Sequence, residues 1–164
     1  MNALDDVNIG LANFWKVTCL DKDGNVKWEE NKKNIIVTVG LNHILDTQFH
    51  ATTQNTTWYI GLKGAGTPIA ANTMASHSSW AELTGYAGNR KAWTEGAASG
   101  GSMTNGSSVD FTINATATVA GAFLNTAATG SSGTLYGVVD FSSSRAVISG
   151  DTLQVTVTVT AASA

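Results

Sequence analysis

The chain has 164 residues, of which 43% are hydrophobic and 13% charged, with a formal net charge of −3. This length suits a single domain with a core of its own. So few charged residues exclude a coiled coil, while 43% apolar content argues against disorder. The absence of a basic surplus argues against nucleic acid as a partner, and no apolar run is long enough to span a membrane. The single cysteine, Cys19, excludes an intramolecular disulfide and is expected to be a small buried side chain.

The N-terminal residues show no strong periodicity. Residues 1–13 are therefore predicted to form an arm that packs on something else, such as a neighbouring subunit. Residues 1–10 have no basic start and no long apolar segment, so they do not form a secretory signal. The predicted organisation is an arm over residues 1–13 followed by one domain over residues 14–164.

The first part of the domain is predicted to contain a β-hairpin and a short helix. Segments 14–20 and 26–30 flank Asp-Lys-Asp-Gly-Asn, and the aspartate, asparagine and glycine in this run favour a turn. Segment 35–39 (IIVTV) is predicted as a strand. Apolar residues then recur at helical spacing over residues 41–49, which predicts the one helix of substance.

The rest of the chain is predicted to be a series of short strands. Segment 58–62 is expected to be a buried strand, 63–73 a loop, 90–95 a strand and 96–108 a loop, while the pattern of 74–88 fits neither a helix nor a strand well. Further strands are predicted at 109–113, 119–124, 135–141, 145–148 and 153–159. Short strands at regular spacing are typical of an all-β sandwich or jelly roll, so a single domain of this class with one short helix is expected.

Charge is distributed unevenly along the chain. Only four charged side chains follow Glu95: Asp110, Asp140, Arg145 and Asp151. A surface so poor in charge favours association with other subunits. We expect residues 1–15 and the threonine-rich face of residues 152–160 to be buried between subunits of a homo-oligomer, most simply a trimer.

Candidate metal ligands have simpler explanations. Asp21, Asp23 and Asn25 resemble part of a calcium loop, but the glycine comes too early and position 32, where a glutamate would be needed, is lysine. The same residues suit the hairpin turn. The three histidines, His43, His50 and His77, show no ligand spacing, so no metal or cofactor is predicted.

Catalytic motifs are equally weak. Cys19 lies within a strand without an adjacent base, and the pairing of Ser76 with His77 in sequence does not indicate a triad. Lys63 to Thr67 is rich in glycine but lacks the Gly-Lys-Ser/Thr of a phosphate loop. No catalytic residue is therefore assigned, and we expect a protein that is not an enzyme.

One enzymatic alternative stays open at this point. Glu82 and Glu95 lie among aromatic residues, Trp80, Tyr86 and Trp93, and paired carboxylates beside aromatic platforms are typical of glycoside cleavage. The competing explanation is that the tryptophans belong to the core or an interface and that Glu95 pairs with Arg90 or Lys91.

Several sequence blocks together resemble a known class of proteins. They are Asn34 to Leu45 (NIIVTVGLNHIL), Trp58 to Leu62 (WYIGL), Ala75 to Glu82 (ASHSSWAE), Tyr86, Asn89-Arg90, Trp93, Val109 to Phe111 (VDF), Ala120 to Leu124 (AGAFL) and Gly150 to Val155 (GDTLQV). In this order they resemble small virion proteins of tailed bacteriophages, often described as capsid decoration (cement) proteins or loosely as tail fibre proteins. The resemblance extends from about residue 14 to the C-terminus.

The resemblance implies a structural role on the virion. It implies a β-rich, often trimeric protein, made in the host cytoplasm, that binds the outside of the capsid and clamps neighbouring copies of the major capsid protein. The alternative is a tail or fibre component that binds a host receptor or glycan, for which the loops 63–73 and 96–108 would be used.

Overall fold

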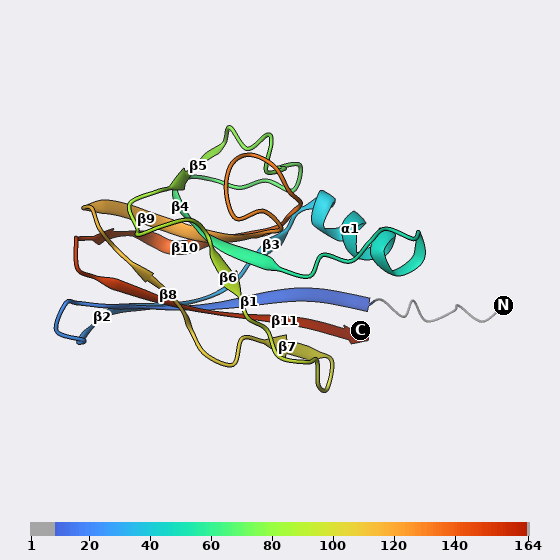
Figure 1. Cartoon of the computed structure of the whole chain (residues 1–164), viewed down its shortest axis with the longest axis horizontal. Helices are drawn as coiled ribbons and strands as arrows, with labels where there is room; N and C mark the ends of the chain where they lie inside the picture. The colour runs from blue at the N-terminus through green and yellow to red at the C-terminus, as the bar shows by residue number, and fades with distance from the viewer. Residues whose placement is uncertain (1–8, 164) are drawn as a thin grey trace.

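The computed structural model describes residues 9–163, which form a sandwich of two antiparallel β-sheets with one short helix (Figure 1). The expected all-β sandwich with a single helix is confirmed. The elements are β1 (Ile9–Leu20), β2 (Val26–Lys33), β3 (Ile35–Ile36), α1 (Thr38–Phe49), β4 (Trp58–Gly66), β5 (Trp80–Leu83), β6 (Lys91–Trp93), β7 (Ser102–Thr104), β8 (Val109–Thr112), β9 (Ala117–Asn125), β10 (Leu135–Val147) and β11 (Thr152–Ser163).

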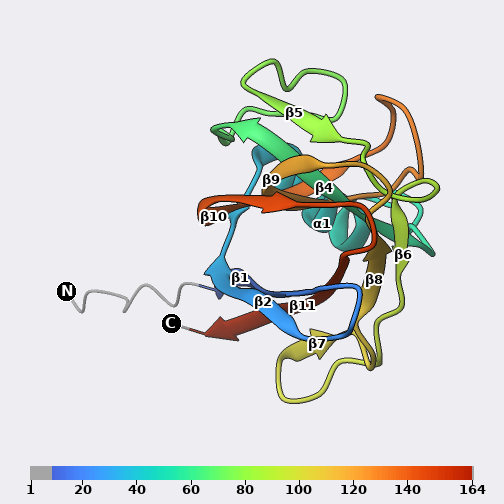
Figure 2. The same ribbon diagram turned by 90° about the vertical axis from the view of Figure 1, so that its left-hand side faces the viewer.

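Each sheet is built around its long strands. Sheet A has the order β2-β1-β11, with β7 and β8 both pairing with the far edge of β11. Sheet B has the order β3-β10-β9-β4, with β5 and β6 both pairing with β4. Figure 2 shows the two sheets stacked face to face. The longest pairing joins the two ends of the described chain, since β1 and β11 align from Ile9 opposite Ser163 to Leu20 opposite Thr152.

The core lies between the sheets because the strands alternate apolar and polar residues. Trp15 and Val17 from β1 are buried against the apolar faces of the other strands, and Val155 and Val157 do the same from β11. A second, smaller cluster includes Phe123, which faces away from this core, and it is covered by Met74 and Trp80. The loop between β4 and β5 therefore closes the outer side of sheet B.

The predicted hairpin is confirmed as β1 and β2. Its turn is held by the Asp21 carboxylate, whose Oδ1 accepts hydrogen bonds from the backbone N–H groups of Asp23 and Asn25, both at 2.9 Å. Gly24 adopts a φ of 83°, a conformation that side chains other than glycine rarely adopt. The turn residues thus act locally, as their sequence indicates.

Several predicted boundaries are wrong. The strand predicted over 35–39 covers only Ile35–Ile36, because the helix begins at Thr38, three residues earlier than expected. The two strands predicted over 135–148 are a single strand, β10, with an irregular register between Asp140 and Arg145. Strand β4 continues to Gly66 into the predicted loop 63–73, and the predicted loop 96–108 contains β7.

The predicted N-terminal arm is described only in part. Residues 9–13 belong to β1 and continue its antiparallel pairing with β11, so the predicted boundary after residue 13 falls inside a strand. Residues 1–8 lie outside the described part of the chain.

Candidate functional site

The two carboxylates considered for glycoside cleavage have different surroundings. Glu82 on β5 is bound by the guanidinium of Arg90, whose Nε and Nη2 donate to the two carboxylate oxygens at 2.8 and 2.7 Å. Arg90 is 4% exposed and also donates to the carbonyls of Ala127 and Gly130. The expectation that Glu95 pairs with Arg90 or Lys91 is therefore wrong, because Arg90 binds Glu82 and Lys91 Nζ donates to the Ala87 carbonyl. Glu95 is exposed and forms an isolated bridge with Asn105.

The tryptophans near these carboxylates do not form platforms for a sugar. Trp80 and Trp93 are 4% and 5% exposed, and each indole Nε1–H donates to a buried asparagine, Asn72 or Asn105, at 3.1 Å. Tyr86 is buried as well, and desolvation raises its pKa to about 12. These aromatic rings stabilise the fold from inside, so the competing explanation of Trp80 and Trp93 as core residues is confirmed.

Two of the histidines and Lys63 also have structural partners. His43 lies 2.9 Å from the Asn55 amide, and the ring of His77 stacks on Trp80. Lys63 is fully buried, with Nζ 2.6 Å from the Asp140 carboxylate. Within residues 9–163, no three histidine, cysteine, aspartate or glutamate side chains gather where they could hold a metal ion. No helix in that range has both the length and the apolar character needed to cross a membrane.

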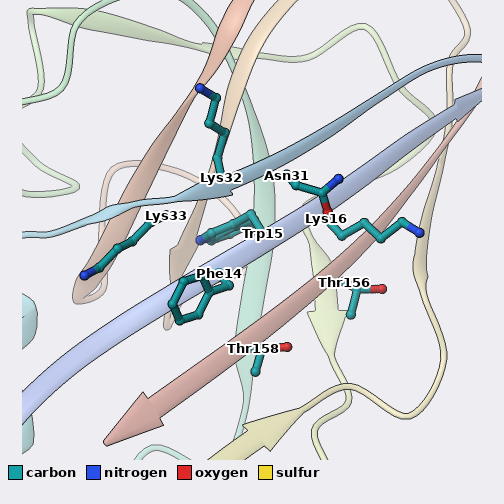
Figure 3. A pocket seen from close by; sticks show the side chains of 8 residues that line it. All are labelled: Phe14, Trp15, Lys16, Asn31, Lys32, Lys33, Thr156 and Thr158. Atoms are coloured by element: carbon teal, nitrogen blue, oxygen red, sulfur yellow. The ribbon is translucent and has the colours of Figure 1, made fainter. Parts of the chain in front are cut away.

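A hollow on the described surface lies on the outer face of sheet A. This groove has a volume of about 550 Å³ and is lined by parts of β1, β2 and β11 (Figure 3). Its lining residues are Phe14, Trp15, Lys16, Asn31, Lys32, Lys33, Thr156 and Thr158. The buried Trp15 side chain belongs to the core on the other side of β1. We call this hollow the sheet A groove.

Strand register places the exposed side chains of the sheet A groove in two rows. Phe14 lies between Lys33 on β2 and Thr158 on β11. The row two residues further along β1 has Lys16 at its centre, opposite Asn31 and Thr156. The Phe14 ring is 47% exposed, which is unusual for an aromatic side chain on a sheet with an apolar core behind it. The groove therefore offers one aromatic ring surrounded by ammonium, amide and hydroxyl groups.

The lysines of the sheet A groove differ in their surroundings. Lys16 Nζ lies 3.8 Å from Glu29, and both side chains are about half exposed. Within the described residues, Lys33 has no carboxylate within salt-bridge distance. Lys32 leaves β2 in a different direction from Lys33, as expected for consecutive strand residues (Figure 3). The Phe14 row thus carries a positive charge that no described side chain neutralises.

A second surface feature is apolar and lies where β1 begins and β11 ends (Figure 1). Leu41, Leu45 and Phe49 of α1 are 38%, 56% and 80% exposed and follow one another at a spacing of four, so they form a ridge on one side of the helix. Beside the helix is a cleft of about 190 Å³ between the sheets. It is lined by Leu11, Ile44, Trp58, Trp93, Met103, Leu124, Tyr136 and Val159. We call the ridge and the cleft together the apolar end.

Sequence reasoning found neither surface as a site. The apolar spacing of residues 41–49 predicts a helix but not its exposed ridge, since only Gly40 of α1 is buried. For the sheet A groove, the sequence of β1 did contain a usable pattern. Alternation in β1 assigns Trp15 and Val17 to the core, which leaves Phe14 and Lys16 on the outer face. The threonine face of residues 152–160 was predicted to be buried between subunits, and its Thr156 and Thr158 line this groove.

Comparison with known proteins gives one family. A family model described as podophage GP4 fiber I protein gp80 matches residues 35–162. No curated protein matches the chain significantly. The matched range runs from β3 almost to the end of β11, so it includes the apolar end except Leu11, but not the β1–β2 hairpin. The family description is that of a structural fibre protein of a phage virion.

Proposed function

Because the chain belongs to the family of the podophage GP4 fiber I protein gp80, we propose that it is a non-enzymatic structural subunit of a virion fibre. The resemblance to phage virion proteins is confirmed at the level of a phage structural protein. The family description names a fibre, which favours the fibre alternative over capsid decoration. A virion fibre is therefore the location that we propose for the protein.

The apolar end supports a subunit that assembles with other copies of itself. Three large apolar side chains on one helix are costly to leave in water, since burial of a leucine or phenylalanine contributes roughly 1.5–3 kcal/mol. Residues 34–62, which include α1, contain a single charged side chain, Asp46, apart from two histidines. A surface with so little charge has few groups that could form ion pairs with a charged partner. A second copy of the same apolar surface is complementary to it.

Symmetry makes the same contact available to every copy. A closed ring of subunits buries the apolar end of each copy against its neighbour and leaves no apolar edge for uncontrolled growth. We propose a homo-oligomer held by the apolar end, with a trimer as the expected order.

The location is tested by counting copies in purified virions. Calibrated mass spectrometry gives the ratio of this chain to the major capsid protein, and labelling with a gold-conjugated antibody gives its position on the particle. A small number of copies, with label at the tail, supports the fibre. A ratio matching the capsid lattice, with label over the head, contradicts the fibre and supports capsid decoration. Absence from virions contradicts both.

The assembly is tested by light scattering of the purified chain. A trimer has three times the monomer mass of 17.0 kDa. The double variant Leu45→Ser/Phe49→Ser is expected to lower the mass towards 17.0 kDa while the circular dichroism spectrum stays unchanged. The control is Ile148→Ser, because Ile148 is 53% exposed, close to the 56% of Leu45, but lies outside the apolar end. A wild-type monomer, or equal masses for wild type and double variant, contradicts this assembly.

A further inference from the structure

The sheet A groove combines an exposed aromatic ring, a lysine without a carboxylate partner among residues 9–163, and several uncharged hydrogen-bonding groups. We propose that it binds an acidic saccharide, with a sugar ring against Phe14 and an anionic substituent of the sugar near Lys33. This inference rests on the proposed fibre function for its biological setting only, because a virion fibre would meet the saccharide as part of a surface polysaccharide. The binding site itself follows from the chemistry of the groove.

Phe14 provides the apolar contact. Its ring is 47% exposed at the centre of the row formed by Lys33 and Thr158. A pyranose ring has one face made mainly of C–H groups and an edge of hydroxyls. When that face covers the Phe14 ring, it removes apolar area from water and leaves the hydroxyls at the rim.

The groups around Phe14 suit those hydroxyls. The Asn31 side chain offers an N–H₂ donor and a carbonyl acceptor, and a threonine hydroxyl can act as either. Asn31 is exposed, and Thr156 and Thr158 are half-buried in the wall of the groove. Binding sites for small polar ligands typically combine apolar contact area with a few such polar groups.

Charge selects an acidic sugar over a neutral one. Lys33 has no carboxylate partner among the described residues, so an anionic substituent on the ligand can approach it without displacing another anion. Lys16 adds a second ammonium group in the next row, although Glu29 at 3.8 Å reduces its effect. A lysine ammonium acts as a point charge and accepts a carboxylate or a phosphate. The shared requirement is therefore a sugar with an anionic group.

The family match does not account for this site. Phe14, Lys16, Asn31 and Lys33 all lie before residue 35, where the match begins, and only the two threonines lie inside it. The β1–β2 hairpin contributes the exposed Phe14 ring and the ammonium groups of Lys16 and Lys33. Specificity for a saccharide would therefore reside in this hairpin of the chain.

The test is a titration of the purified full-length chain with defined oligosaccharides and a control peptide. Binding is measured by calorimetry or by changes in NMR chemical shift. The probes are an oligogalacturonate, which carries carboxylates, a phosphorylated mannose oligomer, a neutral maltooligosaccharide and a polyglutamate peptide. We expect at least one acidic sugar to bind more tightly than the neutral sugar. The first two probes distinguish a carboxylated from a phosphorylated source.

Two variants and a matched control localise the binding. Phe14→Ala is expected to weaken binding of the acidic sugar about tenfold, because it removes the whole aromatic contact. Lys33→Glu is expected to weaken binding roughly five-fold, with a reduced dependence on salt. The control is Lys22→Glu, which makes the same charge change on an exposed lysine in the turn between β1 and β2 that does not line the groove.

Three outcomes overturn the proposal. One is that acidic and neutral sugars bind with equal affinity, or that none of the probes binds. Another is an equal loss of affinity in Lys33→Glu and Lys22→Glu, which indicates non-specific attraction. The third is tighter binding of polyglutamate than of any sugar, which indicates a peptide partner. Copy counting in virions is independent of all three, so the failure of the saccharide site can be distinguished from failure of the fibre assignment.

Discussion

Arg145 on β10 binds Glu30 on β2 and thereby joins the edges of the two sheets. Its Nε and Nη2 donate to the same carboxylate oxygen at 3.0 and 2.6 Å, and Ser142 donates to the other oxygen through its backbone N–H and hydroxyl. The guanidinium also lies 5.8 Å from the centre of the Trp28 ring. Glu30 is 4% exposed, whereas the side chain of Arg145 is 33% exposed. The carboxylate is the buried partner and therefore the more sensitive one.

Glu30→Gln is expected to lower the free energy of unfolding by about 1–3 kcal/mol, because charge-assisted hydrogen bonds in a buried position are lost. Denaturant unfolding measures the change. Glu29→Gln is the control, since Glu29 is exposed on the neighbouring position of β2 and is expected to have little effect. Equal losses in the two variants would contradict a structural role for the Glu30–Arg145 pair.

The same pair predicts a dependence of stability on pH. Burial alone would raise the pKa of Glu30, but the hydrogen bonds from Arg145 and Ser142 outweigh it and lower the pKa below the usual 4.5. A group whose pKa is lower in the folded state stabilises the fold above its unfolded pKa. That contribution is lost as the pH falls through the folded value. Thermal melts between neutral and strongly acidic pH should show a steeper loss for wild type than for Glu30→Gln, and parallel curves would contradict this.

Arg90→Lys is expected to destabilise the protein by about 2–4 kcal/mol, although the charge is kept. A lysine cannot reproduce the two-point contact with Glu82 together with the hydrogen bonds to the Ala127 and Gly130 carbonyls. Lys91→Arg on the next residue is the control. The melting temperatures of the two variants give the comparison, and a neutral Arg90→Lys would show that the carbonyl contacts contribute little.

Gly40→Ala is expected to destabilise the chain by about 1–3 kcal/mol, although alanine normally favours a helix over glycine. A Cβ at this position would lie 2.4 Å from the Tyr136 carbonyl oxygen, so the helix would have to move away from β10. Gly106→Ala serves as the control, because nothing lies within 4 Å of its Cβ position. A stabilising Gly40→Ala, measured by denaturant unfolding, would show that α1 shifts without cost.

Cys19 is expected to resist thiol reagents until the protein unfolds. Burial raises the pKa of the thiol to about 11, with a further contribution from the Asp151 carboxylate that Lys27 partly offsets. The reactive thiolate is therefore scarce as well as inaccessible at mildly alkaline pH. Labelling in native buffer and in concentrated guanidinium chloride measures the difference. Cys19→Ser/Thr18→Cys, which moves the thiol to the opposite face of β1, should be labelled at once in native buffer.

The sequence alone predicts those features that depend on neighbouring residues. The turn between β1 and β2 follows from Asp21 and Gly24, and the alternation in β11 assigns Val155 and Val157 to the core. The start of α1 could not be predicted. Val37, Val39 and Gly40 favour a strand followed by a break, and only the close approach of Tyr136 explains a glycine inside the helix.

The surroundings of the candidate site residues were harder to predict from the sequence than the fold. Glu82, Trp80 and Trp93 have hydrogen-bond partners only 8 to 12 residues away, namely Arg90, Asn72 and Asn105. Their surroundings nevertheless depend on distant segments, since Trp80 packs on Phe123 and Arg90 donates to the carbonyls of Ala127 and Gly130. Phe14 lies outside the aromatic-rich stretch that drew the sequence interpretation. Alternation in β1 places Phe14 on the outer face, but its position between Lys33 and Thr158 results from the register of β1 with β2 and β11, which no local pattern specifies.

The pairing of β1 with β11 also determines the order of events in folding. Leu20 meets Thr152 only after more than a hundred further residues have been synthesised. At roughly 5–20 residues per second, β1 must wait several seconds for its partner on the ribosome. Contacts so distant in sequence also slow folding in solution, because a long loop must close before the strands pair. During this interval β1 has an unpaired edge, so nascent chains are expected to be most prone to aggregation before β11 is complete.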